Sequence, residues 1–398
     1  MTRLLHRDDP YLLEFEAAVV ARREHQGRPA VVLDRTAFYA ESGGQPWDTG
    51  TLGGVPVIAV VEQEGEVLHV LGSSLAADTV RGRVDADRRR DHMQQHHGQH
   101  LLSRALVELA SAATVSFHLG AVDSTIDLDV FVSEADLRRA EGRCNDVVWE
   151  GRPVRSRVVD RNQTEALGVH AAQEAGDAVR LVEADGFDVQ ACGGTHPRRT
   201  SEVGVVLVLG HERYKAGSRV RFVCGARALA AFRARAAAVD RVGALLSSPL
   251  ADLAASVERL QERLSEATRR ARDLADRALV AEAQRLIDRD GSPTVVTAVY
   301  EGWPPEDLRT LAQHLVAQAP CVALVAGRTA GKAHVVFAQS EGLPHDIPRL
   351  LREALADLGG RGGGKGNLAQ GGSDNATGLE AALARAEHAV RERSAARA

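Results

Sequence analysis

The first 86 residues contain short runs rich in valine, separated by turn residues. Two of these runs, residues 29–34 and 55–62, have the composition typical of β-strands. The glycine pair at 53–54 and the Glu-Gly step at 64–65 mark turns between strands. Short strands joined by tight turns predict a small antiparallel β-barrel over residues 1–86.

The hydrophobic period becomes helical after residue 86. A helix is expected from about 88 to 112, because its apolar residues fall on one face: Leu101, Leu102, Ala105, Leu106 and Leu109. Further strands are expected at 115–118, 125–132, 179–182, 205–209 and 220–224, with a helix at 134–148. Together these elements predict an α+β domain over residues 87–230.

Between residues 248 and 290 apolar residues recur at alternating spacings of three and four, from Leu250 through Leu264 to Ala281. Charged residues fill the positions between them. This is a heptad seam, which requires a partner helix. A helix over 228–246 or a second copy of the chain would satisfy it, so residues 231–292 are predicted to be a helical coiled-coil linker.

After Gly291 the pattern is again α/β. Strands are expected at 294–299, 321–326 and 335–339, and helices at 306–319, 347–358 and 379–392. A glycine-rich loop over 362–372 is expected on one surface of this domain, residues 293–398. The whole chain is therefore predicted to be an α+β multidomain protein.

Length and composition agree with this division. A chain of 398 residues is too long for one ordinary core, and 44% hydrophobic with 26% charged residues is normal for a globular protein. No apolar run approaches a membrane span, and no signal peptide is recognisable. Four scattered cysteines suit a reducing compartment better than a disulfide framework, so a cytoplasmic location is expected.

The net charge of −5 argues against a simple nucleic-acid binder, because such proteins usually carry a basic face. Local basic patches remain possible. Arginines cluster at 152, 155, 157 and 161, although a solvated surface explains that cluster equally well. Arg361 and Lys365 flank the glycine-rich run, where they and the backbone amides could bind phosphate or a nucleotide.

The strongest chemical signal is a pair of half-sites with the same spacing. His96 and His100 lie four residues apart on the predicted helix, and Cys192 and His196 repeat that spacing around a Gly-Gly turn. Three imidazoles and a thiolate match the ligand preferences of zinc. Four protein ligands would close a tetrahedron, which is usual for structural sites, whereas catalysis needs an open position. Both roles stay open.

Several motifs resemble the editing region of alanyl-tRNA synthetases. The resemblance is carried by residues 36–50 (TAFYAESGGQPWDTG), by the two metal half-sites, by residues 215–228, and by the glycine-rich run at 362–372, which is similar to the DHHA1 module. The order is that of the family and covers nearly the whole chain. Because no room for a class II aminoacylation domain precedes Thr36, the chain resembles a free-standing editing protein of the long AlaX type rather than a ligase.

The resemblance implies a zinc-dependent hydrolase that acts in trans on tRNA(Ala) carrying serine or glycine. Gln45 would form hydrogen bonds at the reacting ester, and Thr36 would distinguish the seryl hydroxyl from the alanyl methyl. Glu41 and Asp48 would support the pocket, although capping or an ion pair within the barrel explains Asp48 better. In the C-terminal module, Arg361, Lys365 and Asn367 would contact tRNA, and a homodimer could form through this half.

Alternatives remain. A non-catalytic tRNA-binding protein would use the zinc only structurally, and a zinc hydrolase could act on a small ester or D-aminoacyl adduct. One departure concerns the family's Glu-x-Cys segment, where this chain has Gln190, which predicts a neutral group beside the metal ligands and weaker metal binding. His92 and His97 lie on other helix faces and are not expected to be ligands.

Overall fold

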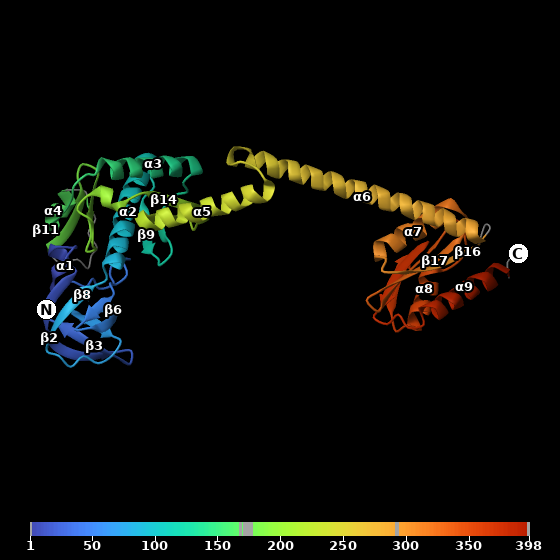
Figure 1. The fold of residues 1–398 in the computed structure, drawn as a ribbon, viewed down its shortest axis with the longest axis horizontal. Helices are drawn as coiled ribbons and strands as arrows, with labels where there is room; N and C mark the ends of the chain where they lie inside the picture. Colours follow the sequence, from blue (N-terminus) through green and yellow to red (C-terminus); the bar gives the residue numbers. More distant parts are fainter. Residues whose placement is uncertain (1, 167–168, 170–177, 291–293, 396–398) are drawn as a thin grey trace. The chain divides into compact units, whose positions relative to one another are not determined.

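The computed structural model describes residues 2–166, 169, 178–290 and 294–395. The chain divides into two compact units, Met1–Val242 and Gly243–Ala398 (Figure 1). Each unit combines helices with sheets, which confirms the predicted mixed α and β multidomain architecture. Among the helices of the described residues, none is long and apolar enough to span a membrane.

The first unit begins with a six-stranded antiparallel sheet that closes on itself. Its hydrogen-bonded order is β2 (Glu14–His25), β3 (Arg28–Leu33), β7 (Glu66–Leu71), β6 (Val55–Gln63), β5 (Gly50–Leu52) and β8 (Thr79–Val84), which pairs back with β2. Alternate residues face inward, and Phe15, Leu33, Phe38 and Leu71 fill the interior. A short parallel pair, β1 (Arg3–Leu4) and β4 (Arg35–Thr36), lies outside this ring, and α1 (Leu5–Asp8) follows β1.

The long helix α2 (Ala86–Ala110) leaves the barrel and enters the second core of this unit. Asp85 caps its first turn by accepting the backbone N–H groups of Asp87 and Arg88. Its apolar face packs on a four-stranded sheet of β14 (Val206–Tyr214), β15 (Gly217–Cys224), β10 (Ser124–Leu128) and β9 (Thr114–Leu119), and on α3 (Glu134–Glu150). Strand β10 is shorter than the predicted 125–132 because the chain turns after Leu128 towards the N-cap of α3 at Ser133.

A three-stranded antiparallel sheet carries the second half-site. It consists of β11 (Val154–Asp160), β12 (Ala178–Ala184) and β13 (Asp188–Ala191), and the sequence pattern identified only β12. Five of the seven residues of β11 are exposed, so the strand lacks a clear apolar alternation. The short helices α4 (Arg161–Ala166) and η1 (Thr200–Val203) and the helix α5 (Gly225–Leu246) complete the elements of this region.

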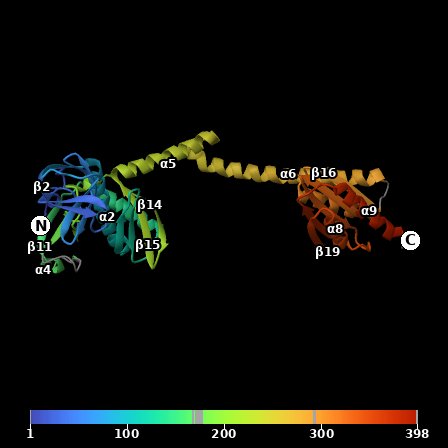
Figure 2. The same cartoon turned by 90° about the horizontal axis from the view of Figure 1, so that it is seen from below.

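The second unit is a three-layer domain. Its sheet has the order β16 (Val295–Glu301), β17 (Val322–Thr329), β18 (Lys332–Gln339), β20 (Leu368–Ser373) and β19 (Arg361–Lys365), with only β16 and β17 parallel. The helices α8 (Ile347–Ala356) and α9 (Leu379–Ala395) pack on one face (Figure 2). The helix α7 (Pro305–Gln318) and the end of α6 (Leu253–Asp290) pack on the other.

The earlier part of α6 extends beyond this sheet and follows the short η2 turn (Leu250–Asp252) (Figure 1). The predicted heptad seam lies along it, and Leu264 and Leu274 each expose 66% of their surface. The helix itself is as predicted. The partner of the seam stays a prediction.

The glycine-rich segment differs from the predicted loop, because residues 361–373 form the edge hairpin β19–β20. Glycine is needed for the close packing: a side chain at Gly362 would meet the Leu355 side chain at 2.6 Å and the Gly371 Cα at 2.8 Å. With no side chains to alternate, the sequence of this strand carries no period by which a strand could be recognised.

Candidate metal centre

The structure brings the two predicted half-sites together. His96 and His100 project from the buried middle of α2, and Cys192 and His196 lie in the turn that follows β13. The potential ligand atoms of these four residues all lie within 4.8 Å of one another. The Cys192 Sγ is 3.3 Å from His96 Nε2 and 3.2 Å from His196 Nε2. Such distances suit the edges of a tetrahedron around one ion.

The Cys192–His196 turn approaches α2 closely because of its glycines. A Cβ on Gly194 would lie 2.2 Å from His96 Cε1, so no other residue fits there without displacing a ligand ring. Arg180 on β12 fixes the turn from the other side, because its Nη1 donates to the carbonyl oxygens of Cys192 and Gly194 at 2.9 and 3.0 Å. The Gly194 N–H points to the Cys192 sulfur at 3.4 Å.

Gln45 contacts His96 at Nδ1, the ring nitrogen that does not face Cys192. Its Oε1 accepts from His96 Nδ1 at 2.7 Å and from the Thr195 N–H at 3.1 Å, while its Nε2 donates to the Thr195 hydroxyl at 2.9 Å. The Nδ1 proton leaves the lone pair of His96 Nε2 free for the cluster. The amide atoms of Gln45 thus contact His96 and Thr195, and its predicted contact with the ester stays a prediction.

The sequence predicts a neutral group beside the metal ligands, but in the structure a carboxylate lies next to His100. Asp188, on β13, is buried, and its Oδ2 lies 3.5 Å from His100 Nδ1. Gln190 donates from Nε2 to Asp188 Oδ1 at 3.2 Å. The carboxylate therefore comes from four positions before Cys192, and Gln190 orients it. The register of β13 on β12, in which Asp188 pairs with Ala184, determines which side chain reaches α2.

His97 is a neighbour of the cluster and lies outside the set of four. Its Nδ1 is 3.2 Å from Nδ1 of His196. Because the Nε2 of His196 faces Cys192, its Nδ1 carries the proton and donates to His97. Burial lowers the pKa of His97 well below its usual value, so this ring is a neutral acceptor. The expectation that His97 is not a ligand agrees with this geometry.

The electrostatics of the cluster favour a thiolate. Burial alone would raise the pKa of the Cys192 thiol, but its close contacts with the rings of His96, His196 and His100 hold that pKa well below its usual value. Burial lowers the pKa of His196 to about 3, which leaves it neutral. Burial opposes protonation of His100 as well, but Asp188 and Cys192 raise its pKa to about 10.

These residues fit a divalent metal ion. A thiolate is the form of cysteine that binds metal, and His96 and His196 each use one nitrogen for an outer partner and turn the other to the sulfur. One thiolate and three imidazoles are the donor set that zinc accepts in tetrahedral sites. On binding, His100 would release its proton.

Two parts of the chain match known protein families. Residues 179–222 match the threonyl and alanyl tRNA synthetase second additional domain, and residues 291–392 match the DHHA1 domain. The alanyl-tRNA editing protein AlaX-L of Pyrococcus horikoshii is 32% identical over 391 residues, which cover 93% of this chain and 94% of that protein. The chain belongs to the alanyl-tRNA editing protein family.

Longer relatives match the same residues. The alanine–tRNA ligases of Pyrococcus furiosus and Thermococcus kodakarensis are each 32% identical, and the matches cover 93% and 96% of this chain. The chain spans only 42% and 43% of those ligases. Among solved structures, the C-Ala domain of Aquifex aeolicus alanyl-tRNA synthetase is 30% identical over 22% of this chain and 83% of that chain, with a TM-score of 0.22.

The other predicted catalytic residues of this editing-family chain lie apart from the ligands. Thr36 is fully buried, and its hydroxyl donates to Nε2 of His69 at 2.8 Å and accepts the Phe38 N–H at 3.1 Å. Burial lowers the pKa of His69 to about 4, so that ring is a neutral acceptor. Glu41 is exposed and lines a separate hollow with His92 and Arg227. Their catalytic roles stay predictions.

Asp48 forms a buried ion pair, the structural role that the sequence favours for this residue. Its carboxylate bonds to Arg89 of α2, with 3.1 Å between Arg89 Nε and Asp48 Oδ2, and both side chains are buried. Arg89 also donates to the carbonyl oxygens of Ala37 and Pro10 at 2.6 Å each. This group, which the sequence pattern did not predict, fastens the start of α2 to the segment that contains Gln45.

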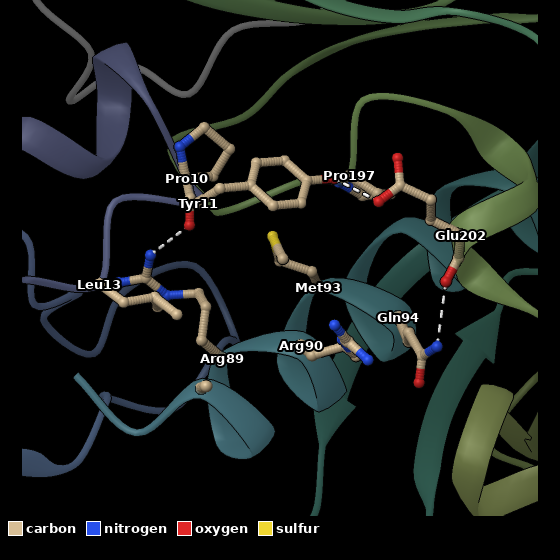
Figure 3. A pocket seen from close by; sticks show the side chains of 10 residues that line it. Pro10, Tyr11, Leu13, Arg89, Arg90, Met93, Gln94, Pro197 and Glu202 are labelled. Carbon is tan, nitrogen blue, oxygen red and sulfur yellow. Dashed lines mark hydrogen bonds between the residues drawn. The ribbon is translucent and has the colours of Figure 1, made fainter.

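A hollow of about 350 Å³ lies beside this group, where the N-terminal segment meets α2 and the turn after His196 (Figure 3). Tyr11 donates to Glu202 at 2.6 Å across it, and Gln94 of α2 donates to the Glu202 carbonyl at 3.0 Å. The Tyr11 oxygen also accepts the Arg198 N–H. These contacts fix the chain directly after His196, so the second half-site is held at both ends.

The predicted tRNA-contacting residues lie in the second unit, on or beside the edge hairpin. Arg361 and Lys365 belong to β19, and both are exposed. Within the described residues, neither side chain forms an ion pair. Asn367, in the turn between β19 and β20, accepts from Gln339 Nε2 at 2.9 Å and so contributes to the hairpin structure.

Proposed function

We propose that this chain is a trans-editing aminoacyl-tRNA deacylase that removes serine or glycine from tRNA(Ala). The observation that carries the proposal is the cluster of three histidines and Cys192 beside a cleft of about 1030 Å³, to which Cys192 and Gly193 contribute. A cleft of this size can admit the end of a macromolecule. Membership in the alanyl-tRNA editing family supports the same reaction and the same tRNA.

In this proposal zinc is the bound metal, which supplies a Lewis acid to polarise the ester or its attacking water. Water adds to the ester carbonyl carbon, the bond from that carbon to the ribose oxygen breaks, and the ribose oxygen takes a proton. Gln45 and Asp188 keep the rings of His96 and His100 oriented throughout. Arg180 keeps the Cys192 turn in place.

The deciding experiment is a deacylation assay of the full-length zinc-loaded protein with Ser-, Gly- and Ala-tRNA(Ala). We expect Ser- or Gly-tRNA(Ala) to be hydrolysed about tenfold or more faster than Ala-tRNA(Ala), because a pocket distinguishes one hydroxyl or methyl group by roughly 1–3 kcal/mol. Equal rates for all three substrates would contradict editing specificity.

A second candidate is a tRNA-binding protein in which the metal is structural. Four protein ligands favour it, because closed tetrahedral sites are usually structural. The same assay separates the two. A folded, metal-loaded and tRNA-binding protein that hydrolyses none of the three substrates would support the structural role and reject the deacylase.

In this proposal the second unit binds tRNA. Exposed Arg361 and Lys365 on an accessible edge are suited to phosphate contacts. We expect the full-length double variant Arg361→Ala, Lys365→Ala to bind tRNA about tenfold more weakly at one fixed salt concentration. The slope of log K against log salt concentration should also become shallower, by about one for each phosphate contact that is lost.

The matched control is Arg352→Ala, which removes an exposed arginine of α8 from the same unit. Unchanged tRNA affinity in the double variant would show that the hairpin does not contact tRNA. A homodimer through this half is also proposed, since the α6 seam exposes Leu264 and Leu274; sedimentation velocity measures it.

A further inference from the structure

The cleft beside Cys192 has a strongly basic lining. Arg3 and Arg7 come from the N-terminal segment, Arg157 from β11 and Arg180 from β12, whereas Asp8 is the one carboxylate residue among the described residues that line it. This concentration of positive charge contrasts with the net charge of −5 of the whole chain. A basic cleft in an acidic protein points to an anionic ligand.

Arg180 is the innermost of these arginines. Its Nη1 donates to the Cys192 and Gly194 carbonyl oxygens, but its buried Nε has no hydrogen-bond partner. Within the described part of the chain, no carboxylate lies at ion-pair distance from it. A half-buried guanidinium that lines the cleft beside the metal cluster, with no carboxylate partner, provides positive charge for an anion bound there.

The outer arginines are also available. Arg7 is exposed and forms neither a hydrogen bond nor an ion pair with any described residue. Arg157 lies 3.7 Å from Glu183, and both side chains are partly exposed, so the attraction between them is weak. Of the neighbouring arginines, Arg152 lies close to Glu150 and Arg155 lies 3.9 Å from Asp185.

We propose that this cleft binds the sugar–phosphate backbone of the single-stranded 3′ end of an aminoacylated RNA. Arg7 and Arg157 contact its phosphate groups, and Arg180 faces the last phosphate before the ester. This inference rests on the proposed deacylase function and adds the residues that guide its substrate to the metal. Guanidinium groups pair with phosphate oxygens through two parallel N–H bonds, which fixes the strand as well as attracting it.

The test compares two substrates of the full-length protein: Ser-tRNA(Ala), and 3′-O-seryl-adenosine, which has the same ester and no phosphate. In Arg7→Ala and in Arg157→Ala, we expect the ratio of kcat/KM for the tRNA to that for seryl-adenosine to fall about tenfold at low salt. A single charge-assisted contact has about this effect. The fall should be in KM rather than in kcat.

A binding measurement makes the test independent of hydrolysis. Fluorescence anisotropy with a short single-stranded oligoribonucleotide should show about tenfold weaker affinity in each variant. The slope of log K against log salt should be shallower by about 0.7 per arginine removed. Arg104→Ala is the matched control, an exposed arginine of α2 without a described partner and away from this cleft. Arg180 is left in place because it holds the Cys192 turn.

Unchanged substrate ratio and unchanged oligoribonucleotide affinity in both variants would overturn the proposed cleft. An equal loss with both substrates would also overturn it, because that result assigns the arginines to the ester or to the released amino acid. If the wild-type protein binds the oligoribonucleotide through Arg7 and Arg157 but hydrolyses neither substrate, the deacylase proposal fails while the cleft stands. Metal analysis of each variant checks that zinc content is unaltered.

Discussion

The Cys192→Ala variant should lose its metal and, with it, its hydrolytic activity. The zinc content of the wild-type protein should be one ion per chain. We expect the variant's metal affinity to fall by more than about 100-fold, because even residues that only orient a metal ligand contribute 10–100-fold. The Cys192 thiolate also lies within 3.3 Å of two of the three histidines, so its removal leaves them without a shared anionic partner. Metal analysis after dialysis measures the result.

Cys144→Ala is the matched control from the same unit. Cys144 is buried in the core of α2 and α3, and burial raises the pKa of its thiol, so it stays protonated and binds no metal. This variant should keep one zinc per chain. Full zinc occupancy in the double variant His96→Ala, Cys192→Ala would exclude the assigned ligand set.

The Asp48→Ala variant should lose about 3–5 kcal/mol of the free energy of unfolding of the first unit. Arg89 is 1% exposed and would keep its charge without a carboxylate, which is the costly way to break a buried ion pair. Asp48 Oδ2 also accepts the Tyr39 N–H at 2.7 Å, so a second buried group loses its partner. Urea unfolding followed by circular dichroism measures the change.

Two further variants identify the cause. Glu14→Ala breaks the exposed ion pairs of Glu14 with Arg81 and Arg83 and should leave the urea concentration at the unfolding midpoint nearly unchanged. Replacing both partners, as in Asp48→Leu, Arg89→Met, should recover much of the loss, because no unpaired charge is then buried. If Asp48→Ala unfolds at the urea concentration of the wild-type protein, the pair has no stabilising role.

The ligands of the metal centre could be predicted from the sequence because the information is local. Two residues at i and i+4 on a helix share a face whatever the rest of the fold does, and a Gly-Gly turn brings Cys192 and His196 together in the same way. The equal spacing and the complementary ligand types of the two half-sites then joined them into one zinc site. The helical seam and the strands β16, β17 and β18 of the second unit were likewise visible because their apolar patterns are strong.

The contacts that Asp188, Gln45 and Thr36 make with histidine side chains could not be predicted in this way. Asp188 reaches His100 only through the pairing of β13 with β12, and the sequence around it contains no clear strand signal. Gln45 was singled out, but its contact with His96 depends on a residue 51 positions away. The hydroxyl of Thr36 faces His69 inside the barrel, which is a further long-range contact. Register and packing, rather than local pattern, determine all three.

The metal ligands join distant parts of the chain, since Cys192 and His96 are 96 positions apart. In the unfolded chain these positions would seldom meet, because closing a loop of that length has a substantial entropic cost. Binding by the assembled cluster therefore pulls the folding equilibrium towards the native state, and the free energy of metal binding is also folding free energy. If the cluster binds its proposed ion, the cellular supply of that ion would control how much of the protein survives proteolysis, and metal starvation would lower its abundance before it changed the rate of any surviving molecule.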